Sequence, residues 1–160
     1  MIRTEQDGGR LTVVLDRPCR RNALTRAMVE GLTAALRGAT AAKVVVLTGA
    51  GRAFGAGADL SDTEESGFSG AEGVEDQLNA EYKPGVLAIH HARKPWVAAV
   101  NGPCAGISYS YAMACDLVLM AESSYLYQPF VGIGLVPDGG ATWLLPHLIG
   151  SKRAYELMAL

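Results

Sequence analysis

The chain has 160 residues, of which 49% are hydrophobic and 19% are charged, a balance typical of one globular domain with a buried core. The net charge of −2, with no basic segment interleaved with aromatic residues, argues against a nucleic-acid partner. No apolar run approaches the ~20 residues that span a bilayer, and the N-terminal stretch MIRTEQDGGR is too polar for a signal peptide, so we expect a cytoplasmic protein without a membrane partner.

The first half of the chain alternates between strand and helix patterns. Residues 11–16 (LTVVLD) are short and β-branched, which predicts a strand. Residues 25–39 carry apolar side chains at helical spacing behind Thr25, a candidate N-cap. Residues 43–49 (KVVVLTG) form a continuous apolar run, which predicts a second strand, buried on both faces and parallel to the first.

The second half repeats this alternation after residues 61–73 (SDTEESGFSGAEG), an acidic, aperiodic stretch that predicts a mobile loop. Residues 96–102 (WVAAVNG) predict a strand that starts after Pro95. The remaining predicted elements are a helix in residues 105–116, a strand at 117–121, a Gly/Pro-rich segment at 128–141 and a last helix at 151–160.

Residues 48–59 (TGAGRAFGAGAD) raise the question of a phosphate-binding loop. A dinucleotide fingerprint needs G-x-G-x-x-G at the entry to a helix, but Phe54 occupies the third glycine position after Gly49 and Gly51. A simple turn explains these two glycines. It does not explain the small residues of GAGAD, which leave backbone N–H groups open.

A second loop of small residues, 101–108 (NGPCAGIS), also follows an apolar strand and precedes a helix. Two strand ends of one sheet that each present an open amide can converge on a single oxygen atom. This is the arrangement of an oxyanion hole, which stabilises negative charge as it develops on a carbonyl oxygen.

Four stretches together carry a family resemblance: RPCRRNALT, GRAFGAGADL, KPWVAAVNGPCAGISYSYAMACDLVLMAE and GIGLVPDGGATWLLPHLIG. They resemble the crotonase, or enoyl-CoA hydratase/isomerase, superfamily, in the same order and over nearly the whole chain. The resemblance implies an α/β fold of repeated ββα units wound into a spiral, with residues 1–160 as one acyl-CoA-binding core domain. Family members continue with C-terminal helices that cover the acyl pocket and complete a trimer, so we expect this sequence to be a truncated one.

The resemblance also implies a ligand and a set of site residues. The ligand is an acyl-CoA thioester, with no cofactor besides the coenzyme A that the substrate carries, and the assembly is a homotrimer or a dimer of trimers. The backbone N–H groups of Ala56 and Ile107 would hold the thioester oxygen. The other substrate-binding positions implied are Ala23, Ala58, Asp59, Leu60, Gly106 and Phe130, and the acyl pocket is expected mainly from residues 61–81 and the missing C-terminal part.

The acid and base decide which reaction follows. Family hydratases use two glutamates, whose positions are taken here by Ser110 and Phe130, so the standard hydration mechanism is disfavoured. Asp138, in GLVPDGG, lies where enoyl-CoA isomerases and ring-1,2-epoxyphenylacetyl-CoA isomerases carry their single acid/base. A double-bond shift or the opening of a ring epoxide needs only one such group.

An apolar setting would raise the pKa of Asp138 for this task, and we expect Phe130, Val131, Leu135 and Trp143 to provide it. The alternative is that P-D-G-G is only a type I turn, in which the aspartate bonds local amides.

Three other interpretations stay open: a hydratase-like lyase with non-standard catalytic residues, an acyl-CoA binder without turnover, and a nucleotide-binding oxidoreductase domain. A metal site and a disulfide are not expected, because the candidate side chains lack the required spacing. These side chains are Cys19, Cys104, Cys115, His90, His91 and His147. Ser108, where many family members have glycine, is expected to narrow the approach to the thioester carbonyl.

Overall fold

The computed structural model describes residues 1–61 and 70–160. Strands and helices alternate through most of the chain, with short 3₁₀ turns (η1, η2, η4) and one π-helical turn (η3) between them. In chain order the elements are β1 (Ile2–Asp7), β2 (Arg10–Leu15), η1 (Pro18–Arg20), α1 (Arg26–Gly38), η2 (Ala39–Ala41), β3 (Val44–Gly49), α3 (Gly70–Gln77), η3 (Leu78–Tyr82), α4 (Lys83–His90), β4 (Trp96–Val100), β5 (Cys104–Ala105), α5 (Ile107–Met113), β6 (Leu117–Met120), β7 (Leu126–Tyr127), η4 (Val131–Ile133), α6 (Ala141–Ile149) and α7 (Ser151–Ala159).

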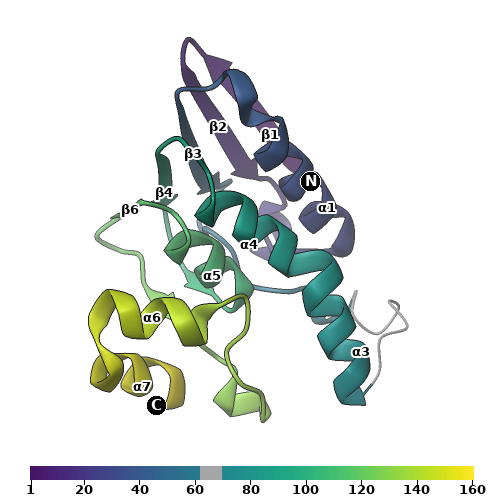
Figure 1. Ribbon diagram of the computed structural model, residues 1–160, viewed down its shortest axis with the longest axis vertical. Helices are drawn as coiled ribbons and strands as arrows, with labels where there is room; N and C mark the ends of the chain where they lie inside the picture. The colour runs from purple at the N-terminus through teal and green to yellow at the C-terminus, as the bar shows by residue number, and fades with distance from the viewer. Residues whose placement is uncertain (62–69) are drawn as a thin grey trace.

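The main sheet has five strands in the order β1-β2-β3-β4-β6. Only the β1–β2 hairpin is antiparallel; β2, β3, β4 and β6 run parallel. Parallel neighbours are joined by helices whose connections turn in one hand, so α1, α4 and α5 lie over the same face of the sheet (Figure 1). The predicted α/β spiral is confirmed by this succession.

The core lies between the sheet and these three helices. Val45 and Leu47 of β3 are fully buried on this side, whereas their neighbours Val44 and Val46 are only half-buried. The prediction that residues 43–49 are buried on both faces is therefore wrong: no described helix covers the second face of the sheet at these positions.

Local signals placed most of the elements correctly. The strands predicted at residues 11–16, 43–49, 96–102 and 117–121 and the helices predicted at 25–39, 105–116 and 151–160 are all present within one to three residues. The hydroxyl of Thr25 accepts a hydrogen bond from the N–H of Met28 at 3.3 Å, as its N-cap role requires. No described helix combines the length and the hydrophobicity needed to cross a membrane.

Two predictions about irregular segments need correction. The loop predicted at residues 61–73 is helical from Gly70 onward, where α3 begins, while residues 62–69 lie outside the described part of the chain. The Gly/Pro-rich segment at 128–141 contains the 3₁₀ turn η4 and leads into α6, which the sequence patterns did not indicate.

Candidate active site

Asn22 holds the glycine loop in place. Its buried carboxamide donates to the carbonyl oxygens of Ala50 (2.9 Å) and Ala53 (2.8 Å) and accepts from the N–H of Arg17 (2.8 Å). Its backbone is left-handed, with φ +57°, a conformation that Asn adopts more readily than most residues. Sequence reasoning missed this residue, which joins the loop after β2 to the loop after β3.

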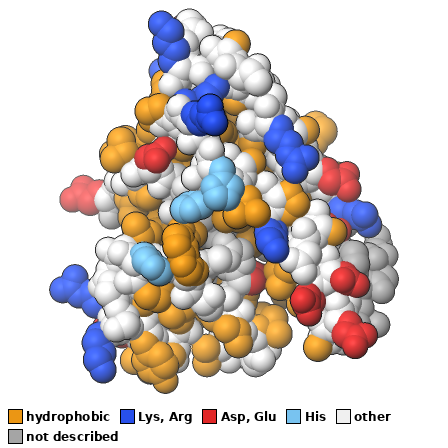
Figure 2. Space-filling model, in the orientation of Figure 1, with side chains coloured by type: hydrophobic (Ala, Val, Ile, Leu, Met, Phe, Trp, Pro, Cys, Tyr) orange, Lys and Arg blue, Asp and Glu red, His pale blue; other side chains and the backbone are white. Residues whose placement is uncertain are grey.

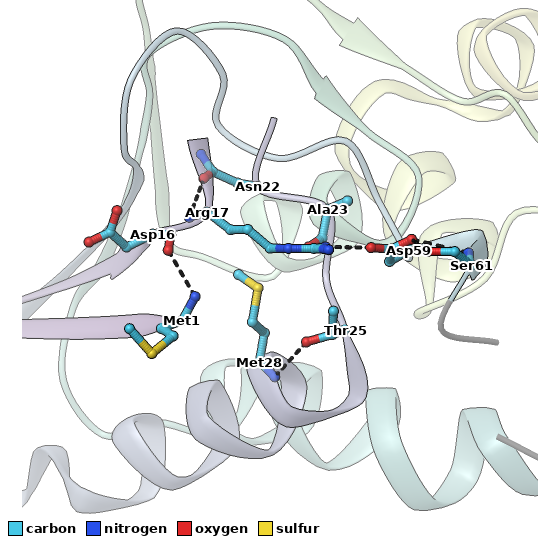
Figure 3. Close-up of polar contacts among 9 residues, drawn as sticks. All are labelled: Met1, Asp16, Arg17, Asn22, Ala23, Thr25, Met28, Asp59 and Ser61. Atoms are coloured by element: carbon cyan, nitrogen blue, oxygen red, sulfur yellow. Dashed lines mark hydrogen bonds and ion pairs between the residues drawn. The ribbon is translucent and has the colours of Figure 1, made fainter. Parts of the chain in front are cut away.

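The next residues connect the same two loops through an ion pair. The guanidinium of Arg17 binds the carboxylate of Asp59 and also donates to the carbonyl of Ala23 at 3.1 Å (Figure 3). Ser61 donates its hydroxyl to Asp59 at 2.6 Å, and this bond, together with Arg17, lowers the pKa of Asp59 to about 2. Leu24 pairs with Ala58 in a parallel bridge, so the predicted coenzyme A residues Ala23, Ala58 and Asp59 lie side by side.

The glycine loop also pairs with the loop after β4. Phe54 donates its N–H to the carbonyl of Pro103 (3.0 Å), and Ala105 donates to Gly55 (2.8 Å). Farther along, Gly57 and Gly106 are in contact: a Cβ built on Gly106 would lie 3.4 Å from the Cα of Gly57. The two small-residue loops identified in the sequence, residues 48–59 and 101–108, are therefore paired by backbone hydrogen bonds and close contact.

This pairing places the two predicted oxyanion amides in adjacent segments. Ala56 precedes Gly57 and Ile107 follows Gly106, and Ile107 is the first residue of α5, whose N–H has no partner within the helix. Within residues 1–61 and 70–160, no acceptor bonds the N–H of Ala56 or of Ile107. Both amides are thus free to bond an oxygen atom of a ligand.

The side chain of Ser108 lies elsewhere than expected from the sequence. Its side chain is fully buried beneath the glycine loop, where its oxygen accepts a hydrogen bond from the N–H of Gly57 at 3.2 Å. A Cβ on Gly55 would lie 2.4 Å from this oxygen, so the serine fits because residue 55 is glycine. Ser108 fastens α5 to the loop instead of narrowing the approach to the carbonyl.

Asp138 lies on a tight turn packed against α5. Both following residues have positive φ, +59° at Gly139 and +83° at Gly140, so the turn is not the predicted type I. The Asp138 carbonyl accepts from the N–H of Ala141 (3.0 Å) and from the hydroxyl of Ser110 (2.9 Å). Ser110, at the position of one hydratase glutamate, therefore bonds the backbone of the residue that carries the remaining carboxylate.

Asp138 is half-buried, and one oxygen of its carboxyl group is withdrawn from water. Its Oδ1 atom is buried with no hydrogen-bond partner among the described residues. Burial raises the pKa of Asp138 to about 6. The predicted rise in pKa is confirmed. Of the four side chains expected to supply the apolar setting, Phe130 is buried, whereas Val131, Leu135 and Trp143 are each about half-exposed.

The turn packs against α5 at the next residue, because a Cβ on Gly139 would lie 2.3 Å from the Cδ1 of Ile107 and 2.7 Å from the Cβ of Ser110. Phe130 is buried, and its ring lies 4.0 Å from where a Gly106 side chain would start, so it adjoins the candidate oxyanion amides.

Gln128, which sequence reasoning missed, is also buried nearby. Neither atom of its amide has a partner in the described part of the chain. The residue before it, Tyr127, accepts a hydrogen bond from the N–H of Gly106 at 3.1 Å.

A hollow of about 480 Å³ lies between α4 and α6, and Gly139 and Gly140 form part of its wall. The facing side chains include Tyr82 and Val86 from η3 and α4, and Trp143 from α6. Of residues 61–81, where the acyl pocket is expected, Leu78 and Asn79 line this hollow, and residues 62–69 lie outside the described part of the chain. This volume is in the range of ligand pockets.

The three histidines lie at helix ends, His90 and His91 at the end of α4 and His147 in the last turn of α6. His90 meets the ring of Trp143 edge-on at 5.5 Å, and the ring of His147 lies 4.4 Å from Trp143. Of the residues that the structure describes, no group of three His, Cys, Asp or Glu side chains is arranged to hold a metal ion. The three cysteines are free thiols, with Cys19 exposed and the other two buried.

Residues 5–160 match the sequence model of the family described as Enoyl-CoA hydratase/isomerase. The chain is 45% identical over 154 residues to a Rhodobacter capsulatus protein named "Probable enoyl-CoA hydratase", a match that covers 96% of this chain and 58% of that relative. It is 35% identical over 162 residues to the 1,2-epoxyphenylacetyl-CoA isomerase of Escherichia coli, covering 99% of this chain and 62% of the isomerase.

Solved structures agree with these similarities. An enoyl-CoA hydratase from Bacillus anthracis superposes with a TM-score of 0.89 at 31% identity, over 98% of this chain and 61% of the hydratase. The chain thus spans about three fifths of the length of the proteins that it matches.

Proposed function

The chain belongs to the enoyl-CoA hydratase/isomerase family, and from this premise we propose that it is the core of an acyl-CoA isomerase in which Asp138 is the single acid/base. The observation that carries this proposal is the carboxyl of the half-buried Asp138, whose Oδ1 atom is buried without a partner among the described residues and whose pKa is raised to about 6. A carboxylate with this pKa accepts a proton near neutral pH and gives it back readily.

In the proposed reaction, the Asp138 carboxylate removes a proton from C2 of a 3-enoyl thioester. The electron pair that is left delocalises onto the thioester oxygen and toward C4. The N–H groups of Ala56 and Ile107 stabilise the enolate oxygen, and each such donor typically contributes about 2.7 to 4 kcal/mol to lowering the barrier. Protonated Asp138 then returns the proton at C4, which leaves a 2-enoyl thioester.

The substrate is placed by elements on either side of these groups. The main chain of Ala23, Ala58, Asp59 and Leu60 would line the coenzyme A path, which the Arg17–Asp59 ion pair keeps in shape. The acyl group would enter the hollow between α4 and α6, whose wall includes Gly139, the residue after Asp138. The ring of Phe130 would cover the reacting carbons beside Gly106.

A second candidate is hydration of a 2-enoyl thioester, because the Rhodobacter capsulatus relative is named as a hydratase. That reaction requires a group that activates water. The hydroxyl of Ser110 is committed to the carbonyl of Asp138, and Phe130 has no acidic group, which favours isomerisation.

Assembly as a homotrimer belongs to the same proposal. It is supported by the apolar side chains that β6 exposes, Leu117 at 58% and Leu119 at 62%. Sedimentation velocity tests it: a trimer is expected, and a monomer at micromolar concentration contradicts this part of the proposal.

Parallel assays test the reaction, with isomerisation of a 3-enoyl-CoA and hydration of a 2-enoyl-CoA measured for wild type, Asp138→Asn and the exposed control Asp76→Asn. We expect isomerisation in wild type and the control and its loss in Asp138→Asn, while binding of a saturated acyl-CoA persists in all three. Hydration that survives in Asp138→Asn contradicts the one-aspartate mechanism. Binding without turnover of either substrate identifies an acyl-CoA binder.

A further inference from the structure

A second and larger hollow, of about 700 Å³, adjoins the hollow between α4 and α6, with which it shares the lining residues Asn79, Lys83, Leu87 and His91. It is lined by the end of α1, by α4 from its first turn to its last, and by Trp96, the first residue of β4. The candidate oxyanion loop begins at Asn101, just after the other end of the same strand. At about 3.3 Å per residue, the two sites are separated by about 13 Å along β4.

The side chains around this hollow are strongly unbalanced in charge. Four cationic residues line it, together with His91, and no Asp or Glu is among its described lining residues. The cationic residues are Arg37, Lys83, Arg93 and Lys94. Figure 2 shows this face, with Lys and Arg side chains on its upper part above the histidines. Since the whole chain has a net charge of −2, the composition does not account for this concentration.

Two of these cations have structural partners. Lys94 donates to the carbonyls of Ala39 and Thr40 in η2, the turn that follows α1. Lys83 donates to the side chain of Asn79 at 3.1 Å. The guanidinium groups of Arg37 and Arg93 have neither an ion pair nor a hydrogen bond within the described chain, although both line the hollow.

Trp96 adds an observation of a different kind. Its side chain is only 1% exposed, and its indole Nε1 is buried without an acceptor among the described residues. A buried donor left unbonded costs about 1 to 3 kcal/mol. Asp116, the nearby carboxylate, accepts from the backbone N–H of Trp96 at 2.8 Å and does not line the hollow. Because Trp96 lines the hollow, a ligand bound there would change the surroundings of its indole ring.

We propose that this hollow binds a small organic phosphate, with Arg37 and Arg93 on the phosphate oxygens and the organic part against its apolar floor. Arginine suits this role because its planar group presents paired donors that match phosphate oxygens. Leu36, Leu87 and Trp96 provide the floor. Arg37 and Arg93 do not line the neighbouring hollow proposed for the acyl group, so phosphate binding is measured without reference to isomerase activity.

The indole N–H resonance of Trp96 is a direct probe of the site. Inorganic pyrophosphate and ADP are titrated into ¹⁵N-labelled protein at low salt, and calorimetry is run in parallel on wild type, Arg37→Gln and Arg93→Gln. Arg153→Gln, an exposed arginine of α7, is the matched control. Both hollow variants replace exposed side chains, so the fold should be retained, which circular dichroism checks.

We expect both probes to shift the Trp96 indole resonance and ADP to bind more tightly than pyrophosphate. Each hollow variant should weaken binding by at least about tenfold, the usual scale for hydrogen bonds to charged groups, while Arg153→Gln stays within about twofold of wild type. An unmoved Trp96 resonance at millimolar concentrations of both probes overturns the proposal, as does unchanged affinity in both variants. Tighter binding of pyrophosphate than of ADP overturns the role of the apolar floor.

Discussion

The hydroxyl of Ser110 donates to the backbone carbonyl of Asp138 across 2.9 Å and so ties the turn that carries the candidate acid/base to the first turns of α5. The same helix begins at Ile107, one of the two candidate oxyanion donors. The spacing between the proton-transfer group and the oxyanion site therefore depends on a single short helix. Variants that loosen this link test whether the arrangement matters for the proposed chemistry.

Ser110→Ala should reduce turnover more than stability. The Asp138 carbonyl keeps its bond from Ala141, so the free energy of unfolding should fall by only about 1 kcal/mol. Without the hydroxyl the turn is less well placed, and kcat for isomerisation should fall about tenfold with little change in KM. Ser124→Ala is the control, because Ser124 also donates to a backbone carbonyl, that of Ala121, but on the exposed surface. Equal kcat values in Ser110→Ala and wild type would show that this link is not needed.

The raised pKa of Asp138 predicts a rise of kcat/KM with pH, half-maximal near pH 6, because the base must be ionised in the free protein. The effect on stability has the opposite sign. Between pH 4 and 6 the folded chain holds more protons at this site than the unfolded chain, so the free energy of unfolding falls as pH rises through this window. The total loss corresponds to about 2 to 3 kcal/mol.

Asp138→Asn removes this titration and should be more stable than wild type at pH 8 but not at pH 4. Urea unfolding at both pH values measures the difference, with the exposed Asp76→Asn as control. A constant difference between Asp138→Asn and wild type across this range would show that the carboxyl is not desolvated.

The sequence correctly predicted the helices and strands whose local residue pattern favours the same structure as their packing in the fold. It missed α4 because Pro84 and Gly85 are typical of a break. Pro84 lies in the first turn of α4, where its missing N–H costs little. Gly85 is needed for packing, since a Cβ there would lie 2.8 Å from the hydroxyl of Tyr111. A contact between helices that are distant in sequence leaves no local pattern.

The loops and the carboxylate of the candidate site could be predicted from the sequence, but the side chains that hold the loops in position could not. The two glycine-rich loops and Asp138 were found from motifs. Ser108 stands out as a departure from the family pattern, but its role could not be predicted because it depends on contact with Gly55 from the other loop. Asn22 had a signal that went unused: a polar residue in the turn after a strand is a common candidate for positive φ.

The turn after Asp138 offers a matched pair of glycine substitutions. Both Gly139 and Gly140 have positive φ, so alanine at either position pays a backbone cost of about 1 kcal/mol. Only at position 139 does the new Cβ collide with α5, at 2.3 Å from Ile107; at position 140 the nearest atom is 3.9 Å away. Gly139→Ala should therefore lower the free energy of unfolding by at least about 2 kcal/mol more than Gly140→Ala and abolish isomerisation. Similar urea midpoints for the two variants would contradict the packing of this turn against α5.

The contact between Gly55 and Ser108 predicts a strong coupling between two substitutions. Gly55→Ala places a methyl group 2.4 Å from the serine oxygen and should destabilise the protein by about 2 to 3 kcal/mol. Ser108→Gly loses the hydrogen bond from the N–H of Gly57 and adds a glycine to α5, which should cost about 2 kcal/mol.

In the double variant the methyl group occupies the space that the serine leaves, so the total loss should be smaller than the sum by more than about 1 kcal/mol. Chemical denaturation of the four proteins measures this coupling, and Gly132→Ala, where a Cβ meets nothing within 4 Å, replaces Gly55→Ala in a control cycle. Additive losses would mean that the glycine loop and α5 are not in contact at this point, and the close approach that aligns the Ala56 and Ile107 amides would lose its support.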